Sequence, residues 1–244
     1  MKSIKLLSCT LLSVVIFSMS CKKNNDISEP NIKKCLVTQM IDSSNFGIDT
    51  SWYTYDNQNR LIQVDYSNPY YSMHYNYQNN RVIEQLIING TNVVHSERVF
   101  NLNEKGLATK SYYTGSTDTV YANFDTKNRL IENSRKQFDY KFEYNYDNNG
   151  DLTKIVHKSY DGSKIINITE AECYKNILLN PNANSDGMYI RSPWDGKFTV
   201  HAFKEYANLS LSYILDNNGN IKKTNEVSQD GSFISAKYFE YKCE

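Results

Sequence analysis

The stretch YNYDNNGDL places oxygen-bearing side chains at alternate positions, as the opening of a calcium-binding loop does. Asp147, Asn149 and Asp151 would supply the first three ligands of such a loop. The sixth loop position is Leu152, where a glycine normally makes the sharp turn, and the twelfth is Lys158, where a glutamate normally closes the site. The sequence therefore favours a bend in the chain at this stretch and predicts no metal site.

The same stretch is one copy of a repeat with a period of about 22 residues. Aligning the copies puts Arg60, Arg129 and Asn220 opposite Asp151, and an arginine cannot ligate calcium. Each copy is an extended segment, a turn and a second extended segment. The copies are YTYDNQNRLIQV (53–64), YNYQNNRVIEQ (75–85), FNLNEKGLATK (100–110), NFDTKNRLIEN (123–133), YNYDNNGDLTKI (144–155) and YILDNNGNIKK (213–223).

The turns of the repeat have the chemistry of hairpins. Asp or Asn in the first turn position accepts hydrogen bonds from backbone N–H groups two residues on, and Asn or Gly in the fourth supplies a positive φ. A second class of turns, at residues 89–90, 115–116, 161–162 and 230–231, places a reversal about every 11 residues. This spacing predicts an antiparallel meander.

The clearest strand is FDYKFEYNY (138–146), in which Phe138, Tyr140, Phe142, Tyr144 and Tyr146 share one face and polar residues share the other. The aromatic face has to be covered, because rings left in water invite aggregation. The sequence therefore predicts an all-β fold: an antiparallel meander of roughly a dozen or more strands in one strongly curved or barrel-like sheet.

Residues 174–210 interrupt the repeat and predict an irregular insertion. The segment from Glu170 to Leu179 suits a short helix that Asn180-Pro181 would end. Two interpretations stay open for the insertion: a plug over the aromatic face, or a functional loop.

The N-terminus has the pattern of a targeting segment. Lys2 and Lys5 precede an apolar run that is too short to span a membrane, and small residues lead to Cys21. Residues 1–20 are predicted to be a signal peptide, residues 21–33 a lipidated cysteine and its polar tether, and residues 34–244 one repeat-built β domain. The predicted location is the outer membrane, as an anchored protein on the periplasmic or the cell-surface side.

Three further cysteines remain in the predicted mature chain, Cys35, Cys173 and Cys243. An oxidising compartment allows one disulfide, and the alternative is that all three are small buried side chains. If Cys35 and Cys243 lie on the first and last strands, a bridge between them requires the sheet to close or nearly close.

The signal segment ending in a cysteine, the YxYDxxxRL repeats and the terminal YFEYKCE together resemble an uncharacterised bacterial lipoprotein family with a porin-like fold. The resemblance covers about residues 34–244 and implies a curved antiparallel sheet, with no activity and no catalytic residues to transfer. The YD motif is also similar to the YD repeats of large toxin-shell proteins, which are far longer and richer in glycine.

Composition argues against several functions. Lys and Arg total 27 and Asp and Glu total 27, so no basic excess points to nucleic acid. The four histidines, His74, His95, His157 and His201, lie in different repeats and in no catalytic motif. We therefore expect no enzyme and no cofactor. The oligomeric state stays open.

The first functional hypothesis is a binding module that holds a glycan or a peptide on its curved sheet, because tyrosine rings combine flat apolar area with a polar tip. The alternative is that these rings are simply core. The candidate ligand-binding residues are Tyr75, Tyr77, Tyr140, Tyr144, Tyr189 and Trp194.

The second hypothesis is a structural or assembly role at the outer membrane, with an envelope protein adding to a sheet edge. A third is a transmembrane barrel, which the charged strand face and the predicted lipid anchor argue against.

Overall fold

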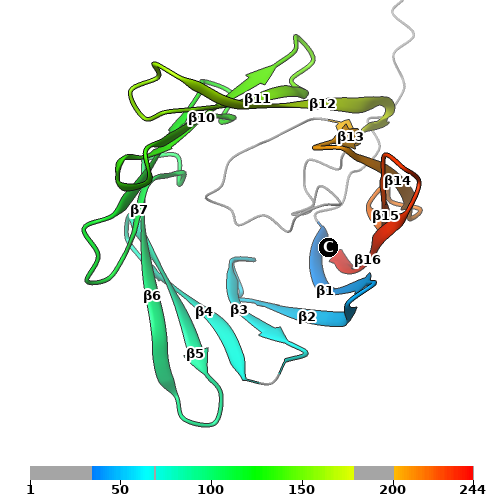
Figure 1. Cartoon of the computed structure of the whole chain (residues 1–244). Helices are drawn as coiled ribbons and strands as arrows, with labels where there is room; N and C mark the ends of the chain where they lie inside the picture. The colour runs from blue at the N-terminus through cyan, green and yellow to red at the C-terminus, as the bar shows by residue number, and fades with distance from the viewer. Residues whose placement is uncertain (1–34, 69, 179–200, 244) are drawn as a thin grey trace, which may run out of the picture. The chain divides into compact units, whose positions relative to one another are not determined.

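The described residues form one closed antiparallel β-barrel (Figure 1). The computed structural model describes residues 35–68, 70–178 and 201–243, all within the second of the two units, 1–31 and 32–244, into which the chain divides. Each strand pairs with the strand before and after it in sequence, as predicted for a meander. The strands are β1 (Cys35–Ser44), β2 (Gly47–Tyr55), β3 (Leu61–Tyr66), β4 (Tyr71–Gln78), β5 (Arg81–Ile88), β6 (Val93–Leu102), β7 (Ala108–Tyr113), β8 (Thr119–Phe124), β9 (Leu130–Arg135), β10 (Tyr140–Tyr146), β11 (Leu152–Lys158), β12 (Ile165–Leu178), β13 (His201–Tyr206), β14 (Leu209–Leu215), β15 (Ile221–Ser228) and β16 (Phe233–Cys243).

Strands β1 and β16 close the barrel. Their register runs from the pair Cys35 and Cys243 to the pair Ser44 and Ser235, and the two cysteines form a disulfide with a Cα–Cα distance of 4.1 Å. The predicted all-β, curved fold is confirmed, and the sheet closes. Each described strand has a neighbour on both sides, so the described sheet offers no free edge to an added strand. A structural or assembly role at the outer membrane stays a prediction.

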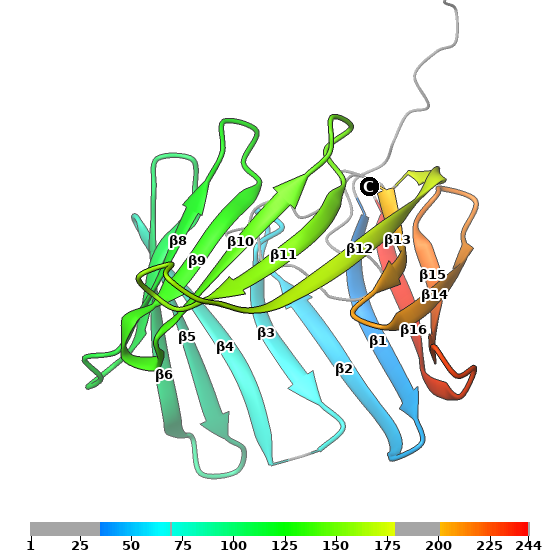
Figure 2. The same cartoon turned by 45° about the horizontal axis from the view of Figure 1, so that its top comes forward.

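The repeat turns lie at one end of the barrel, together with Cys35 and Cys243; we call this end the repeat-turn rim and the other end the distal rim (Figure 2). The positive φ predicted for the fourth turn position is present, for example 59° at Asn59 and 95° at Gly150. The carboxylate of Asp147 accepts the N–H groups of Asn149, Gly150 and Asp151, each at 2.9 Å. Stretch 144–152 is therefore a hairpin bend, and the described residues include no cluster of three metal-ligating side chains.

The tyrosine and the arginine of the repeat make contacts between neighbouring hairpins. Arg60 forms an ion pair with Asp56 at 2.6 Å, four residues earlier in the turn. The guanidinium of Arg60 lies 4.4 Å from the ring centroid of Tyr77, in the next hairpin. The hydroxyl of Tyr77 donates to the carbonyl of Leu61 at 3.0 Å. The motif thus ties each hairpin to its neighbour through side chains as well as through the strand ladder.

The aromatic face of the sheet is the inner face of the barrel. Val37 of β1 and Ala202 of β13 belong to one buried apolar cluster with Ile221 and Phe239, although β14, β15 and β16 separate β1 from β13 in the sheet. Side chains from strands that are not neighbours can meet only on the concave side of a closed sheet. The strand register then places the tyrosines of the repeat on this inner face.

Two local predictions are wrong, and the bounds of a third are too wide. The strand predicted from Phe138 begins at Tyr140, because Lys136–Phe138 forms a 3-10 turn and Asp139 has a left-handed φ of 48°. The helix predicted from Glu170 to Leu179 is part of strand β12, since pairing with β11 overrides the local helix propensity. The insertion predicted for 174–210 contains the regular strand β13 and the start of β14, and residues 179–200 lie outside the described ranges. Within those ranges, no helical segment has the length and apolarity to span a bilayer.

Candidate functional site

The four predicted ligand-binding tyrosines that the structure describes lie on the inner face but not in one place. Tyr75 and Tyr77 are on β4, and Tyr140 and Tyr144 are on β10, six steps away along the strand order. The other predicted site residues, Tyr189, Trp194 and the lipidation residue Cys21, lie outside the described residues. The structure therefore does not assemble the four described tyrosines into a single site.

The β4 tyrosines serve the packing of the barrel. Tyr75 and Tyr77 pack against the buried pair Val82 and Phe100. Burial raises the pKa of Tyr77 well above its ordinary value, and its hydroxyl is held by the Leu61 carbonyl. These two rings fit the interpretation of the tyrosines as core.

The β10 tyrosines belong to a second inner cluster. The ring of Phe142 stacks on His157 at a centroid distance of 4.4 Å, and Tyr140 lies 5.2 Å from Phe142. Asn133 donates to the Tyr144 hydroxyl at 2.9 Å, and burial raises the pKa of Tyr144. His157 packs by stacking on Phe142, so this cluster also fits the interpretation of the rings as core.

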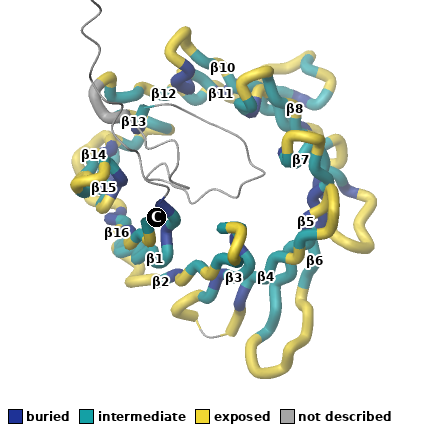
Figure 3. The backbone as a smooth tube through the Cα atoms, turned by 180° about the vertical axis from the view of Figure 1, so that it is seen from behind, coloured by how far each residue is buried: buried dark blue, intermediate teal, exposed yellow. Residues whose placement is uncertain are grey.

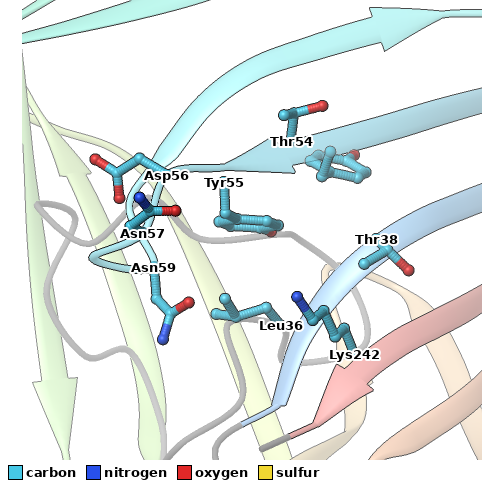
Figure 4. Close-up of a pocket in the computed structure, with 9 residues that line it drawn as sticks. Leu36, Thr38, Thr54, Tyr55, Asp56, Asn57, Asn59 and Lys242 are labelled. Atoms are coloured by element: carbon cyan, nitrogen blue, oxygen red, sulfur yellow. The ribbon is translucent and has the colours of Figure 1, made fainter.

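A pocket of about 420 Å³ lies where β1, β2 and β16 reach the repeat-turn rim (Figure 4). Three of its walls come from strands and the fourth from the turn after β2. Its lining residues are Leu36, Thr38, Tyr53, Thr54, Tyr55, Asp56, Asn57, Asn59 and Lys242. The lining combines two aromatic rings with hydroxyl, amide, carboxylate and ammonium groups, a set that can bind a polar organic molecule.

Local backbone features form this pocket. The ladder between β1 and β16 shifts register between Val37 and Gln39, so Thr38 sits at a bulge. The Tyr55 hydroxyl donates to the Val37 carbonyl at 2.8 Å, which fixes the ring against β1. Asn59 has a left-handed φ of 59°, which turns the chain back toward β3. Figure 4 shows the Tyr55 ring between this turn and the side chains of Leu36 and Lys242.

The polar side chains at the pocket differ in how strongly other residues of the protein bind them. Burial raises the pKa of Tyr53 to about 12, so its phenol stays protonated. Desolvation alone would raise the pKa of Asp56, but hydrogen bonds from the Arg60 backbone and side chain lower it below its ordinary value. Lys242 and Asn57, by contrast, make no side-chain hydrogen bond or ion pair with the described part of the chain. Their polar groups are available to a ligand.

Sequence reasoning missed this pocket for a reason that the topology supplies. In two later repeats the tyrosine ring is covered by the arginine of the preceding repeat turn: Arg60 covers Tyr77 and Arg129 covers Tyr146. Tyr55 lies on β2, and the described residues include no repeat turn before β1. The signal that could have found the pocket is therefore the position of YTYD as the first copy of the repeat.

Comparisons with known proteins support the fold and assign no family or activity. No family model matches the chain, and no curated protein matches it. A porin-like protein from Bacteroides uniformis is similar in structure, with a TM-score of 0.60 and 14% identity over 85% of this chain and 98% of that one. A porin-like protein from Bacteroides vulgatus has a TM-score of 0.52 and 13% identity over 85% of this chain and 99% of that one. The chain thus has a porin-like β-barrel fold, as the resemblance to the lipoprotein family implied.

Proposed function

We propose that the mature protein is a non-catalytic binding lipoprotein of the bacterial envelope, which holds a glycan or a peptide in the pocket between β1, β2 and β16. The pocket of about 420 Å³, with its two rings and its uncommitted polar groups, carries the proposal. Tyr53 and Tyr55 offer flat apolar area, and Asn57 and Lys242 offer hydrogen bonds around it. Sugars and peptides are recognised by this combination of stacking and polar contacts.

The location rests on two features. The apolar N-terminal segment ending at Cys21 favours lipidation of that cysteine and anchoring to the outer membrane, on the periplasmic or the cell-surface side. The disulfide between Cys35 and Cys243 suits an oxidising compartment such as the envelope.

The outer face of the barrel supports a water-exposed barrel over a transmembrane one. Cross-strand ion pairs lie on it, including Lys158 with Glu143 at 2.6 Å and Lys204 with Glu172 at 3.1 Å. A barrel that spans a membrane presents an apolar band to lipid, and charges there are costly.

Isothermal titration calorimetry with a panel of neutral glycans, acidic glycans and peptides tests the proposal. We expect at least one class to bind, and Asn57→Ala to weaken that binding about tenfold, the effect of one lost hydrogen bond. Asn148→Ala is the matched control, because Asn148 holds the same turn position in another repeat, away from the pocket. No binding by any class, or an equal loss in both variants, would remove the support for this pocket.

A further inference from the structure

The distal rim differs in chemistry from the repeat-turn rim. Its hairpins end in exposed aromatic and aliphatic side chains, whereas the repeat turns end in Asp, Asn and Gly. Figure 2 shows the hairpins β1–β2, β3–β4 and β5–β6 projecting from the same end of the barrel, and Figure 3 shows their tips as exposed. The large apolar residues exposed at this end include Phe46, Ile48, Tyr66, Tyr70, Tyr71, Val93, Val94 and Tyr113, on four consecutive hairpins.

These four hairpins also lack charge at their tips. Residues 43–48, 66–76, 86–96 and 111–117 contain no Asp, Glu, Lys or Arg. We call these four segments the uncharged sector. Three of the four remaining hairpins of the distal rim differ, because residues 135–141, 158–164 and 226–232 each carry charged side chains. The fourth, β13–β14, has an uncharged tip at 206–209, with Lys204 and Glu205 directly before it.

Five carboxylates flank the uncharged sector, and they differ in their partners. Asp118 is buried and forms an ion pair with Arg135. Glu97 accepts hydrogen bonds from Gln85 at 2.8 Å and from Thr114 at 2.7 Å. Asp65 accepts hydrogen bonds from Gln63 at 2.9 and 3.0 Å. Asp42 and Asp49 lie opposite each other on β1 and β2, and Asp49 is exposed, with the Ser67 hydroxyl at 3.4 Å.

Several apolar side chains at the tips are largely exposed. Phe46 is 102% exposed, and Ile48 and Tyr70 are 69% and 67% exposed. Exposed apolar clusters of this size mark interaction surfaces. Separate protruding tips insert readily into a fluid surface, whereas a rigid protein partner needs a continuous complementary surface.

We propose that the uncharged sector docks on the lipid bilayer, with its rings and aliphatic side chains in the headgroup region. Phenyl and phenol rings favour this region, and the absence of charge at the tips removes the main cost of entering it. The backbone groups at the hairpin tips stay hydrated at that depth.

The predicted anchor makes the bilayer the surface within reach, and this step rests on the lipidation in the proposed function. The 13 residues between Cys21 and Cys35 can extend to roughly 45 Å. The 10 residues of β1 span roughly 33 Å from the repeat-turn rim to the distal rim. The tether is therefore long enough for the sector to touch the same membrane that holds the lipid.

Vesicle co-flotation of the chain from Lys22 onward tests the sector without the lipid anchor, since residues 35–243 close the barrel by themselves. Failure here would leave the pocket and the lipidation untouched, so it is distinguishable from failure of the proposed function. We expect flotation with neutral phosphatidylcholine vesicles. Binding should not change when salt rises from about 0.1 to 1 M, because no surface charge is involved.

The double variant Phe46→Ser/Tyr70→Ser should lower vesicle affinity roughly tenfold or more, since two exposed rings are lost. Phe138→Ser is the matched control, because Phe138 is 58% exposed in the charged segment 135–141, which lies outside the uncharged sector. Three results would overturn the proposal: no flotation, an equal loss in the control, or binding only to anionic vesicles at low salt. A dimer in light scattering that the double variant dissociates, without flotation, would assign the sector to a second copy instead.

Discussion

The guanidinium of Arg129 lies 4.5 Å from the ring centroid of Tyr146, and the Tyr146 hydroxyl donates to the carbonyl of Leu130 at 2.7 Å. Arg60, Tyr77 and Leu61 show the same relationship three repeats earlier in the chain. The arginine comes from one repeat and the tyrosine from the next, so the motif acts between hairpins rather than within one. It holds neighbouring hairpins together where the strand ladder ends at the repeat-turn rim.

Removing the hydroxyl of Tyr146 should destabilise the barrel. Tyr146→Phe keeps the ring under Arg129 and loses the bond to the Leu130 carbonyl, at a cost of about 1 kcal/mol in the free energy of unfolding. Urea denaturation measures this. Tyr121→Phe is the control, because Tyr121 is exposed and makes no hydrogen bond with the described residues, and its stability should stay within error of the parent. If Tyr146→Phe is as stable as Tyr121→Phe, the Tyr146 hydroxyl contributes nothing to the contact between neighbouring hairpins.

Local turn chemistry made the fold predictable from the sequence. Asp in the first turn position and Asn or Gly in the fourth determine a reversal within five residues, as Asp147 and Gly150 show. The aromatic face was predictable from the alternation of aromatic and polar residues along the strands alone. Closure was predictable only as a condition on Cys35 and Cys243, because no local pattern says which strands meet across 208 residues.

The parts that failed depend on contacts between distant segments. Residues 170–178 carry helix-favouring side chains, but the pairing of Lys154 with Glu170 draws the segment into β12. The pocket depends on a bulge at Thr38, which no sequence pattern indicates, and on a contact between Tyr55 and Val37, whose only sequence signal is the position of YTYD as the first copy of the repeat. The predicted ligand-binding residues Tyr75, Tyr77, Tyr140 and Tyr144 lie away from this pocket, because alternation identifies a face and not a position around the barrel.

Breaking the disulfide should destabilise the barrel strongly. The bridge closes a loop of 208 residues in the unfolded chain, and its loss in Cys35→Ser/Cys243→Ser should cost roughly 5 kcal/mol on the chain-entropy estimate. Thermal unfolding with and without a reducing agent measures the effect. The parent should melt at a lower temperature when reduced, and the double variant should not respond to the reductant.

Cys173 provides the control for that experiment. Its thiol lies 3.9 Å from the Leu152 carbonyl and takes no part in the bridge. Cys173→Ser should therefore keep the reductant-dependent fall in melting temperature. A parent protein whose melting temperature ignores the reductant would contradict the closure of β1 on β16 by this bond.

Acid should remove the contribution of Asp161 at the distal rim. Its carboxylate accepts hydrogen bonds from the Ser159 hydroxyl at 2.7 Å and from the Ser163 backbone N–H at 2.9 Å, and these hold its pKa at about 2. The unfolded chain has an ordinary aspartate pKa of about 3.9, so the native state gains stability from the ionised group above about pH 4. That gain is lost as pH falls from about 4 to about 2, because the native carboxylate then becomes protonated too.

Asp161→Asn should therefore melt at a lower temperature than the parent near neutral pH, and the gap should close toward pH 2, as differential scanning calorimetry across this range would show. In a Ser159→Ala background, the difference in melting temperature between Asp161→Asn and its parent should be smaller, because the first of the donors that lower the pKa of Asp161 is gone. Asp230 lies in the second copy of the same Ser-x-Asp-Gly-Ser turn and has a pKa of about 2 for the same reason, so Asp230→Asn should reproduce the pH dependence. A gap between Asp161→Asn and the parent that stays constant from neutral pH to pH 2 would rule out the ionised carboxylate as the stabilising group, and would leave only the geometry of the turn.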